Sequence, residues 1–576
     1  KCVTGDTLVL TDQGVFPIRE LGDPHGPEVQ PLDVGVVQEG ARKSRSAYFY
    51  NGGVKPTFRI ESHTGIAVEG TANHRVRVLH PDGDVRWARM DEIVPGAVLA
   101  VNRATETWAQ ALVDVRAHHV ASVRVHQATE QPDEFDARWG LLMGYLVGDG
   151  SWADRASLCV TVEHPETREE LEGLFRELGG RPSFTLDKRS ARTGACRVHD
   201  KALREFMHNL GFDWDCKSDT KHTPWVVLRS PREVVRAYLQ GLFETDGTVT
   251  KSGLSVSFCS ASKRLARETQ VLLLNFGVLT RLRVKHNNKY DRDYYEITIL
   301  GLRSRKRFSE EIGFRSRKKQ DRLDAGLVNP KKEGGDTESI PHQRAWVSRM
   351  LASIPKSNPR GGLGWRRSTM RAVVGNMCKP GSTEDLSYAR IRALLPIARE
   401  LDVDPEVIHH FKSILEMDYF YDEVVEVVPG EAHVFDLNVP EGESFVANGL
   451  TNHNTTVSAC ISAYETYRLL SKGDPQAYYG LPKTNTIQLI SVATDKDQAG
   501  LLYQEVSGHY RACGFFTQYT ANNTMSYARF QTPKDIEQTG SYQSDPGAKA
   551  TIKVTFRSCI AKGLRGAGNI VIIQIG

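Results

Sequence analysis

The sequence predicts a multidomain protein, in which an all-β domain is split by an inserted α/β domain and followed by a second α/β fragment. Three observations predict this fold class. Short strand-like segments with Gly, Pro and Asp turns lie at both ends of residues 2–454, a repeated motif lies between them, and helices alternate with buried strands after residue 454. A chain of 576 residues also exceeds what one hydrophobic core usually supports, so we expect separate cores.

The composition excludes several classes of protein. Hydrophobic residues make up 40% and charged residues 25%, which are values typical of folded globular proteins. No apolar run reaches the length of a bilayer, so we expect no membrane partner. Nine scattered cysteines without a CxxC pair favour a reducing, cytoplasmic setting. The start Lys1-Cys2-Val3 lacks a Met and a signal peptide, so we expect an internal fragment.

The domain boundaries follow changes in the sequence pattern. The expected segments are residue 1 as a flank, 2–125 and 421–454 as two parts of one β domain, 137–325 as the α/β insert, 326–420 as a linker with a basic helical extension, and 455–576 as the last α/β fragment. The sequence suggests no role for residues 326–420.

Residues able to act as nucleophile, acid or base recur at the ends of the β segments. They are Cys2, Thr71 and His74 in "TANH", Asp436 in "VFDL", His453 and Asn454 in "TNHN", and Thr455. In this order they resemble the intein family, self-splicing elements that start with Cys or Ser, carry an internal TxxH and end in His-Asn before Cys, Ser or Thr. The resemblance implies the Hint fold for the β domain and autocatalytic splicing without a cofactor.

At the first junction, the resemblance implies that the Cys2 thiol attacks the carbonyl of Lys1 to form a thioester. The attack requires a strained amide whose leaving nitrogen becomes protonated. His74, with Thr71 beside it, is the expected source of that proton.

At the second junction, the Thr455 hydroxyl is expected to take the acyl group before Asn454 cyclises and releases Lys1 joined to Thr455. His453 is the expected acid or base, and Asp436 the residue that assists both junctions. Glu443 stands where family members often carry His, so we expect slower or differently assisted Asn cyclisation.

Two alternatives stay open. A hedgehog-like autoprocessing domain uses the same Cys and TxxH chemistry, although it lacks the terminal Asn that Asn454 provides. A degenerate intein that acts only as a DNA-binding protein would keep these residues without activity.

The middle of the chain contains "LMGYLVGDG" at 142–150 and "LQGLFETDG" at 239–247, with later Gly landmarks in one register. These copies resemble the LAGLIDADG motif of homing endonucleases. The resemblance implies two packed helices that bring the carboxylates of Asp149 and Asp246 together, with Mg²⁺ between them and double-stranded DNA as the substrate. Lys221 and Lys319 are the expected basic residues near the phosphates.

A cluster of basic residues follows the second motif and predicts a phosphate-binding surface. Its members are Arg303, Arg305, Lys306, Arg307, Arg315, Arg317, Lys318, Lys319 and Arg322. Only three acidic residues interrupt them in the sequence: Glu310, Glu311 and Asp321.

Splicing would create Lys1-Thr455-Thr456 at the start of a helix, which is the end of a Walker A phosphate loop. Residues 455–576 resemble the P-loop ATPase domain of phage terminase large subunits, which package DNA. The resemblance implies ATP and Mg²⁺ only for the spliced host, with phage packaging proteins as partners in an infected or lysogenic prokaryotic cell. The loop is interrupted in this chain, so we expect no ATPase activity before splicing.

Overall fold

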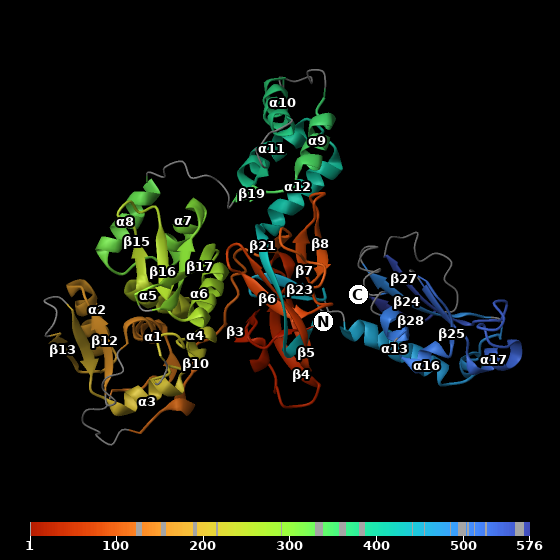
Figure 1. The fold of residues 1–576 in the computed structure, drawn as a ribbon, viewed down its shortest axis with the longest axis horizontal. Coiled ribbons are helices and arrows are strands. Elements are labelled where there is room, and N and C mark those ends of the chain that lie inside the picture. The colour runs from red at the N-terminus through yellow and green to blue at the C-terminus, as the bar shows by residue number, and fades with distance from the viewer. Residues whose placement is uncertain are drawn as a thin grey trace.

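The computed structural model describes residues 2–121, 129–150, 157–187, 193–214, 217–289, 291–328, 338–355, 364–379, 386–439, 442–453, 456–483, 485–493, 503, 506–511, 513–524, 527–558 and 570–575. A β domain lies at the centre, the inserted α/β domain on one side of it, a helical extension above it and an α/β fragment on the other side (Figure 1). No helix within the described residues is long and apolar enough to cross a membrane.

The β domain is built from strands of both β-rich segments. They are β1 (Val3–Thr4), β2 (Leu8–Thr11), β3 (Gly14–Pro17), β4 (Val29–Val37), β5 (Lys43–Ser62), β6 (Ala67–Thr71), β7 (Arg75–Leu79), β8 (Val85–Arg89), β9 (Val98–Val101), β21 (Phe420–Asn438), β22 (Ser444–Ala447) and β23 (Leu450–His453). The 3-10 helices are η1 (Ile18–Glu20), η2 (Glu39–Ala41) and η3 (Arg116–His118).

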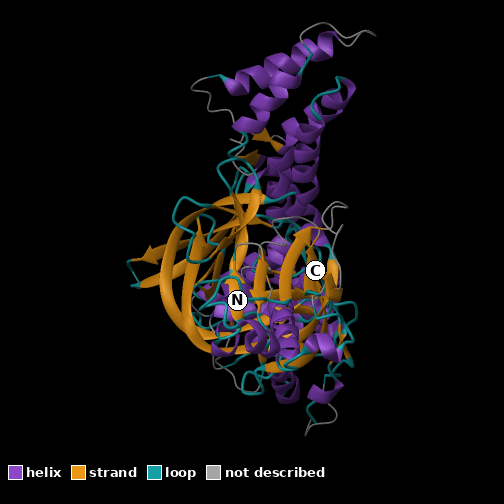
Figure 2. Cartoon of the chain, turned by 90° about the vertical axis from the view of Figure 1, so that its right-hand side faces the viewer, coloured by secondary structure: helices purple, strands orange, loops and turns teal. Residues whose placement is uncertain are grey.

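The two segments interleave in one twelve-stranded sheet with the order β21-β1-β6-β5-β4-β2-β22-β23-β9-β7-β8, and β3 pairs with β2. The long strands β5 and β21 pair antiparallel. Figure 2 shows long, curved strands on one side of the molecule. Val9, Leu99 and Phe435 from distant parts of the sequence are buried in one core. Strand β1 at the start of the β domain likewise pairs with β21, although the whole insert separates the two strands in sequence.

The insert contains two copies of one arrangement. The first copy has α1 (Ala137–Asp149), β12 (Leu158–Val162), α2 (Pro165–Glu177), β13 (Pro182–Leu186), β14 (Gly194–Val198) and α3 (Lys201–Asn209), followed by α4 (Trp225–Leu228). The second has α5 (Arg232–Asp246), β15 (Gly247–Val249), β16 (Val256–Ser260), α6 (Lys263–Asn275), β17 (Thr280–Asn287), β18 (Arg292–Ile299), α7 (Gly301–Glu311) and α8 (Arg317–Val328). The sheet orders β12-β14-β13 and β16-β18-β17 match, with β15 added to the second.

The glycine landmarks of the repeat occupy equivalent backbone positions. Gly179 and Gly277 have φ angles of 80° and 81°, and Gly211 and Gly313 have φ angles of 98° and 64°. Glycine adopts this left-handed conformation without the steric penalty of a Cβ atom, and it commonly ends helices. The shared turns explain why the register of the repeat is visible in the sequence.

The boundary expected at residue 125 falls earlier in the structure. β10 (Val113–Asp114) pairs with β11 (Glu134–Phe135), which leads into α1. The Trp108 ring packs against Phe276 of the insert, with 4.4 Å between the ring centroids. Strand β9 is therefore the last strand of the first β segment, because apolar side chains after it are buried against the insert.

The helical extension contains α9 (Arg344–Ser353), α10 (Gly364–Cys378), α11 (Tyr388–Glu400) and α12 (Pro405–Met417), with a hairpin of β19 (Ser339–Ile340) and β20 (Leu386–Ser387). It docks on the β domain, where the Gln343 side-chain amide donates to the carbonyl of Gly83 at 2.9 Å. Leu79 and Val98 of the β domain share one apolar core with these helices.

The C-terminal fragment is a mixed α/β unit. Its elements are α13 (Thr456–Leu470), α14 (Pro475–Tyr478), β24 (Ile487–Ala493), α16 (Gly514–Thr517), β25 (Thr520–Asn523), β26 (Tyr527–Phe530), α17 (Pro533–Thr539), β27 (Ile552–Ser558) and β28 (Ile570–Ile575). The strand order is β25-β26-β27-β24-β28, and β24 runs parallel to both neighbours.

Candidate functional site

The backbone of Cys2 is held by Thr71 on both sides. The Cys2 amide donates to the Thr71 hydroxyl at 3.1 Å, and the Thr71 amide donates to the Cys2 carbonyl at 2.9 Å. This contact continues the pairing of β1 with β6, in which Val3 lies opposite Gly70. Thr71 therefore fixes the backbone of Cys2 at both its amide and its carbonyl.

Two glycines leave the space that Cys2 occupies. A Cβ atom on Gly70 would lie 2.7 Å from the Cys2 carbonyl oxygen and 3.4 Å from the ring of His74. A Cβ atom on Gly52 would lie 3.1 Å from the Cys2 sulfur. Gly52 lies where the β5–β21 register shifts, so the bulge itself makes room for the thiol. Cys2 consequently sits at the end of β1 in close contact with both neighbouring strands.

The thiol is buried, with 2% of Cys2 exposed. Burial raises the pKa of Cys2 to about 11, and the nearby Asp436 carboxylate also raises it. The register of β1 with β21 pairs Val3 with Phe435, which sets Cys2 opposite Asp436 one step further along. A thiol in this environment is protonated at neutral pH, so its attack on a carbonyl requires a base.

His74 contacts both Thr71 and a residue of the last strand of the β domain, β23. Its amide donates to the Thr71 carbonyl at 2.8 Å, and its Nε2 lies 2.9 Å from Asn452 Oδ1. The Asn452 Nδ2 donates to the Leu450 carbonyl at 2.8 Å, so the Asn452 oxygen faces His74 and the Nε2 carries the proton. Nδ1 of the neutral ring is then the atom able to accept a proton.

His453 follows Asn452 at the end of β23 and is also buried. Its ring meets the Trp87 ring edge to face at 4.6 Å, and the Arg77 guanidinium lies over the same Trp87 ring at 4.1 Å. His453 is thus held against an aromatic face next to the end of the strand. Glu443 precedes β22 with a φ of 44°.

The structure brings together Cys2, Thr71, His74, Asp436 and His453 of the residues predicted at the splice junctions. Asn454, Thr455 and Lys1 lie outside the described residues, as does the side chain of Thr456, which begins α13. Sequence reasoning missed Asn452 and Trp87. The position of Asn452 inside "TNHN", beside His453, is the signal that could have identified it.

A second cluster lies in the insert, where α1 and α5 pack with their backbones in contact. A Cβ atom on Gly144 would lie 2.1 Å from the Tyr238 carbonyl, and one on Gly241 would lie 2.5 Å from the Leu141 carbonyl. Neither position tolerates a side chain at this helix separation. The close approach brings the C-terminal ends of the two helices, and with them Asp149 and Asp246, to one place.

The two carboxylates influence each other. Burial, and after it the charge of Asp149, raise the pKa of Asp246 to about 6. Burial also raises the pKa of Asp149, while Lys221 and Lys319 oppose the shift at both residues. All four predicted residues of the insert are therefore close to one another.

Each lysine is fixed by carbonyl groups at the helix ends. Lys221 Nζ donates to the Gly148 carbonyl at 2.6 Å. Lys319 Nζ contacts the carbonyls of Phe243 and Glu244, and burial lowers its pKa. The amines thus lie beside the carboxylates without forming the direct pairs that would neutralise them.

The donor atoms here suit a hard divalent cation in part. Within the described residues, no group of three or more His, Cys, Asp or Glu side chains converges as a preformed metal cage. Two crowded carboxylates are the ligand type that Mg²⁺ prefers, and Mg²⁺ commonly takes its other ligands from water and phosphate. The residues present fit such an open site.

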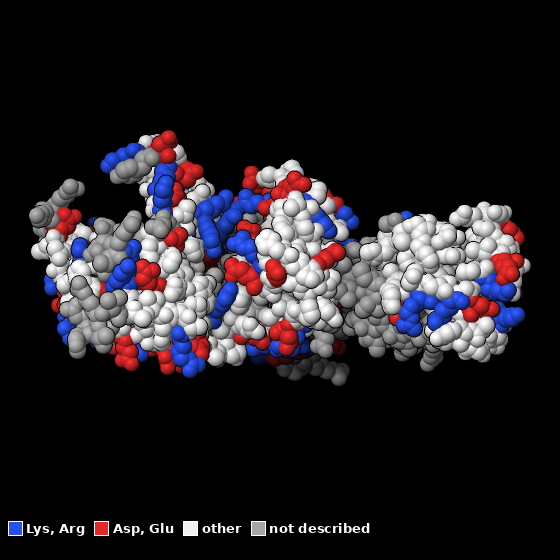
Figure 3. All heavy atoms as spheres, turned by 90° about the horizontal axis from the view of Figure 1, so that it is seen from below, with Lys and Arg blue, Asp and Glu red and all other residues white. Residues whose placement is uncertain are grey.

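The prediction of a phosphate-binding surface at residues 303–322 is wrong for several of its members. Arg303 pairs with Asp418 at 3.0 Å, and Arg307 pairs with Glu311 at 3.1 Å. Arg315 pairs with Glu170, and the buried Arg305 donates to the Leu254 carbonyl at 2.7 Å. Basic and acidic side chains are interspersed over the face seen from below (Figure 3). Lys318, Lys319 and Arg322 instead line a cavity of about 460 Å³ next to α2 and β15.

Residues 233–313 match the family model described as a LAGLIDADG-like domain, so the chain contains such a domain. The replicative DNA helicase DnaB of Rhodothermus marinus is 27% identical over 492 residues, which cover 79% of this chain and 46% of the helicase. The chain thus spans about half the length of that relative.

The replication factor C small subunit of Methanocaldococcus jannaschii is 26% identical over 340 residues, which cover 56% of this chain and 16% of that protein. A crystal structure of I-DmoI in complex with DNA and Ca is 18% identical, covers 31% of this chain and 91% of that chain, and gives a TM-score of 0.24.

Proposed function

We propose that residues 2–454 are an intein that excises itself and joins Lys1 to Thr455. The observation that carries the proposal is the contact path Cys2–Thr71–His74–Asn452, which links the residue after the first junction to the end of β23, beside the second junction. A fold that serves only to bury an apolar core has no need to bring these polar residues together.

At the first junction, His74 Nδ1 accepts the Cys2 proton as the sulfur attacks the Lys1 carbonyl. The C–S bond forms, the C–N bond breaks, and the same proton passes from His74 to the departing nitrogen of Cys2. Thr71 holds that nitrogen through its hydroxyl at 3.1 Å. The raised pKa of Cys2 is the reason that a base is required.

At the second junction, the Thr455 hydroxyl attacks the thioester and returns the thiol to Cys2. The side-chain amide of Asn454 then attacks its own main-chain carbonyl, which forms a succinimide and releases the amine of Thr455. That amine attacks the ester carbonyl of Lys1, so the C–N bond forms, the ester C–O bond breaks and the Thr455 hydroxyl is restored. His453, held against Trp87, supplies the acid or base, and Asp436 lies across the sheet from Cys2 to assist both steps.

The similar proteins support this proposal. A helicase and a replication factor subunit match 79% and 56% of this chain, so the two matched regions overlap. An element inserted in unrelated hosts produces that pattern. The 79% of this chain that matches the helicase is also close to the fraction of the chain that residues 2–454 make up.

We infer that the insert is a homing endonuclease that cuts double-stranded DNA. Asp149 and Asp246 would hold Mg²⁺, which when bound would activate water against a DNA phosphate. Lys221 and Lys319 lie close enough to stabilise charge at the two phosphates. The LAGLIDADG-like match of residues 233–313 and the carboxylate pair support this assignment.

The host is proposed to be a terminase-type P-loop ATPase that binds ATP and Mg²⁺ after splicing and works with phage packaging proteins. Thr456 begins α13 directly after the junction, as the helix after a phosphate loop does. The parallel strands β24, β27 and β28 are the kind of sheet that such a loop precedes.

Mass spectrometry tests the splicing proposal. The chain is expressed with a short tagged peptide before Lys1, next to Cys2→Ala and Asn454→Ala versions. A free species of residues 2–454 and a Lys1–Thr455 junction peptide, both from the parent alone, are expected. One uncut precursor in all three would contradict active splicing and favour the degenerate-intein alternative.

Cleavage of an intein-free host gene, with Mg²⁺ and with EDTA, tests the endonuclease separately.

A further inference from the structure

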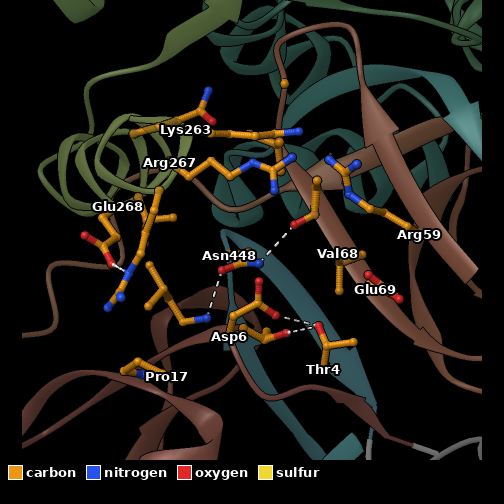
Figure 4. Close-up of a pocket in the computed structure, with 18 of the residues that line it drawn as sticks. Thr4, Asp6, Pro17, Arg59, Val68, Glu69, Lys263, Arg267, Glu268 and Asn448 are labelled. Carbon is orange, nitrogen blue, oxygen red and sulfur yellow. Dashed lines mark hydrogen bonds and ion pairs between the residues drawn. The ribbon is translucent and has the colours of Figure 1, made fainter. Parts of the chain in front are cut away.

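A cavity of about 430 Å³ lies between the β domain and the insert, apart from the carboxylate pair (Figure 4). The β-domain wall includes Thr4, Asp6 and Arg59, and the opposite wall is formed by α6. The two walls are firmly joined, because the Gln270 side chain donates to the Thr64 carbonyl at 3.0 Å and Leu274 packs in the β-domain core. The cavity therefore has a defined shape.

Three cations gather at one end of this cavity. Arg59 comes from β5, and Lys263 and Arg267 come from α6, and their side chains extend toward the same region (Figure 4). Glu61 pairs with both Arg59 and Arg267, the latter at 3.2 Å. One carboxylate is thus shared between two guanidinium groups, with an ammonium group beside them.

The cations repel one another in this arrangement. The pKa of Lys263 is lowered by burial and then by the charges of Arg267 and Arg59. The pKa of Arg267 is lowered by burial and by Arg59. A bound anion at this end would relieve both the repulsion and the loss of hydration.

The acidic residues of the cavity are already engaged by other donors. Asp6 accepts from the Thr4 hydroxyl at 2.8 Å, and Glu69 accepts from the Thr57 hydroxyl at 2.6 Å. Glu268 accepts from Arg264 at 2.7 Å. Each of these three acids is thus hydrogen-bonded to a donor other than the three cations.

We propose that this cavity binds a phosphate-type anion through Arg59, Lys263 and Arg267. Guanidinium groups bind phosphate in bidentate fashion, and a volume of this size suits a small phosphorylated molecule. The phosphate comes either from such a free molecule or from the backbone of DNA bound by the insert. The site does not depend on splicing, so it can be tested independently of the splicing proposed above, and only its DNA alternative rests on the proposed endonuclease.

Calorimetry and thermal melting of the full chain test the site, with inorganic phosphate, adenosine monophosphate and a short random DNA duplex as separate probes at constant ionic strength. Lys263→Gln removes one cation and keeps a polar side chain of similar length. Lys43→Gln, an exposed lysine on β5 away from the cavity, is the matched control. Arg267→Gln is a second variant.

Phosphate is expected to raise the melting temperature of the parent and the control, and Lys263→Gln should weaken binding by about tenfold. If Lys263→Gln weakens binding of the duplex, and neither small molecule binds the parent, the phosphate belongs to DNA. Binding of equal strength in Lys263→Gln and the parent would overturn the proposal. So would the absence of binding by every probe.

Discussion

Nε2 of His74 lies 2.9 Å from Oδ1 of Asn452, although 378 positions separate the two residues in the sequence. The contact is buried, and the Asn452 amide is fixed by the Leu450 carbonyl at 2.8 Å. The ring is thereby set with its proton on Nε2. A residue beside the proposed second junction thus sets the orientation of His74, the proposed proton carrier of the first.

We expect Asn452→Ala to slow the first step, because either tautomer of His74 then becomes accessible and the ring loses its anchor. In an Asn454→Ala background, thiol-induced cleavage at Lys1–Cys2 should fall by at least about tenfold. Asn452→Asp should instead move the pH dependence of cleavage upward, since a carboxylate favours the imidazolium.

Asn209→Ala, in α3 of the insert, controls for loss of an asparagine elsewhere. Melting temperatures separate misfolding from a chemical defect. Cleavage by Asn452→Ala at the parental rate, with an unchanged pH profile in Asn452→Asp, would show that the contact has no part in positioning His74.

Gly70→Ala should displace Cys2 from Thr71. The new Cβ atom would lie 2.7 Å from the Cys2 carbonyl oxygen, so the end of β1 must move. We expect a loss of about 1–3 kcal/mol in the free energy of unfolding and a marked fall in thiol-induced cleavage. Denaturant unfolding and cleavage gels measure the two effects.

Gly173→Ala in α2 is the matched control, because its Cβ atom meets nothing within 4 Å. It should leave cleavage unchanged and stabilise the helix slightly. If Gly70→Ala cleaves and unfolds like this control, the close packing around Cys2 is not required.

Much of the first cluster could be predicted from sequence, because the nucleophile and the TxxH residues carry their chemistry in their identity. Cys2, Thr71, His74 and His453 needed only the fold to bring them together. Asn452 was different, since its role depends on the Leu450 carbonyl that fixes its orientation and on a His74 ring from a distant strand. Neither contact leaves a periodic pattern in the sequence.

In the insert, the sequence predicted the carboxylate pair but misjudged the basic cluster. Two copies of one motif in one register predicted the paired helices and the position of Asp149 beside Asp246. The charge of residues 303–322 was misleading, because the acids that neutralise it come from elsewhere in the chain, such as Glu170 and Asp418. A local count of charge cannot register partners that the fold supplies.

The Cys2 thiol should react slowly with an alkylating reagent at pH 8. Its pKa is raised to about 11 by burial, so the thiolate fraction rises by about tenfold per pH unit up to that value. Peptide mass spectrometry after iodoacetamide treatment should therefore find the exposed Cys513 alkylated well before Cys2. Equal rates at the two cysteines at pH 8 would contradict the buried environment of Cys2.

Asp246→Asn should abolish DNA cleavage and yet stabilise the insert near neutral pH. The pKa of Asp246 is about 6 in the folded chain and lies near 4 in an unfolded one, so folding favours the protonated carboxyl. The stability that protonation contributes is fully present below the unfolded pKa and is lost as pH rises through about 6. At pH 7.5 the ionised Asp246 therefore lowers the free energy of unfolding of the parent by about 1–3 kcal/mol, and Asn removes this penalty.

Denaturant unfolding at pH 7.5 and pH 4 measures the difference in stability between Asp246→Asn and the parent, which should shrink at the lower pH. Asp402→Asn, at an exposed turn of the helical extension, is the control for loss of a carboxylate elsewhere in the chain. Equal stability of Asp246→Asn and the parent at both pH values would mean that neither burial nor the charge of Asp149 disfavours the ionised Asp246, which would remove the electrostatic reason for a cation at the pair.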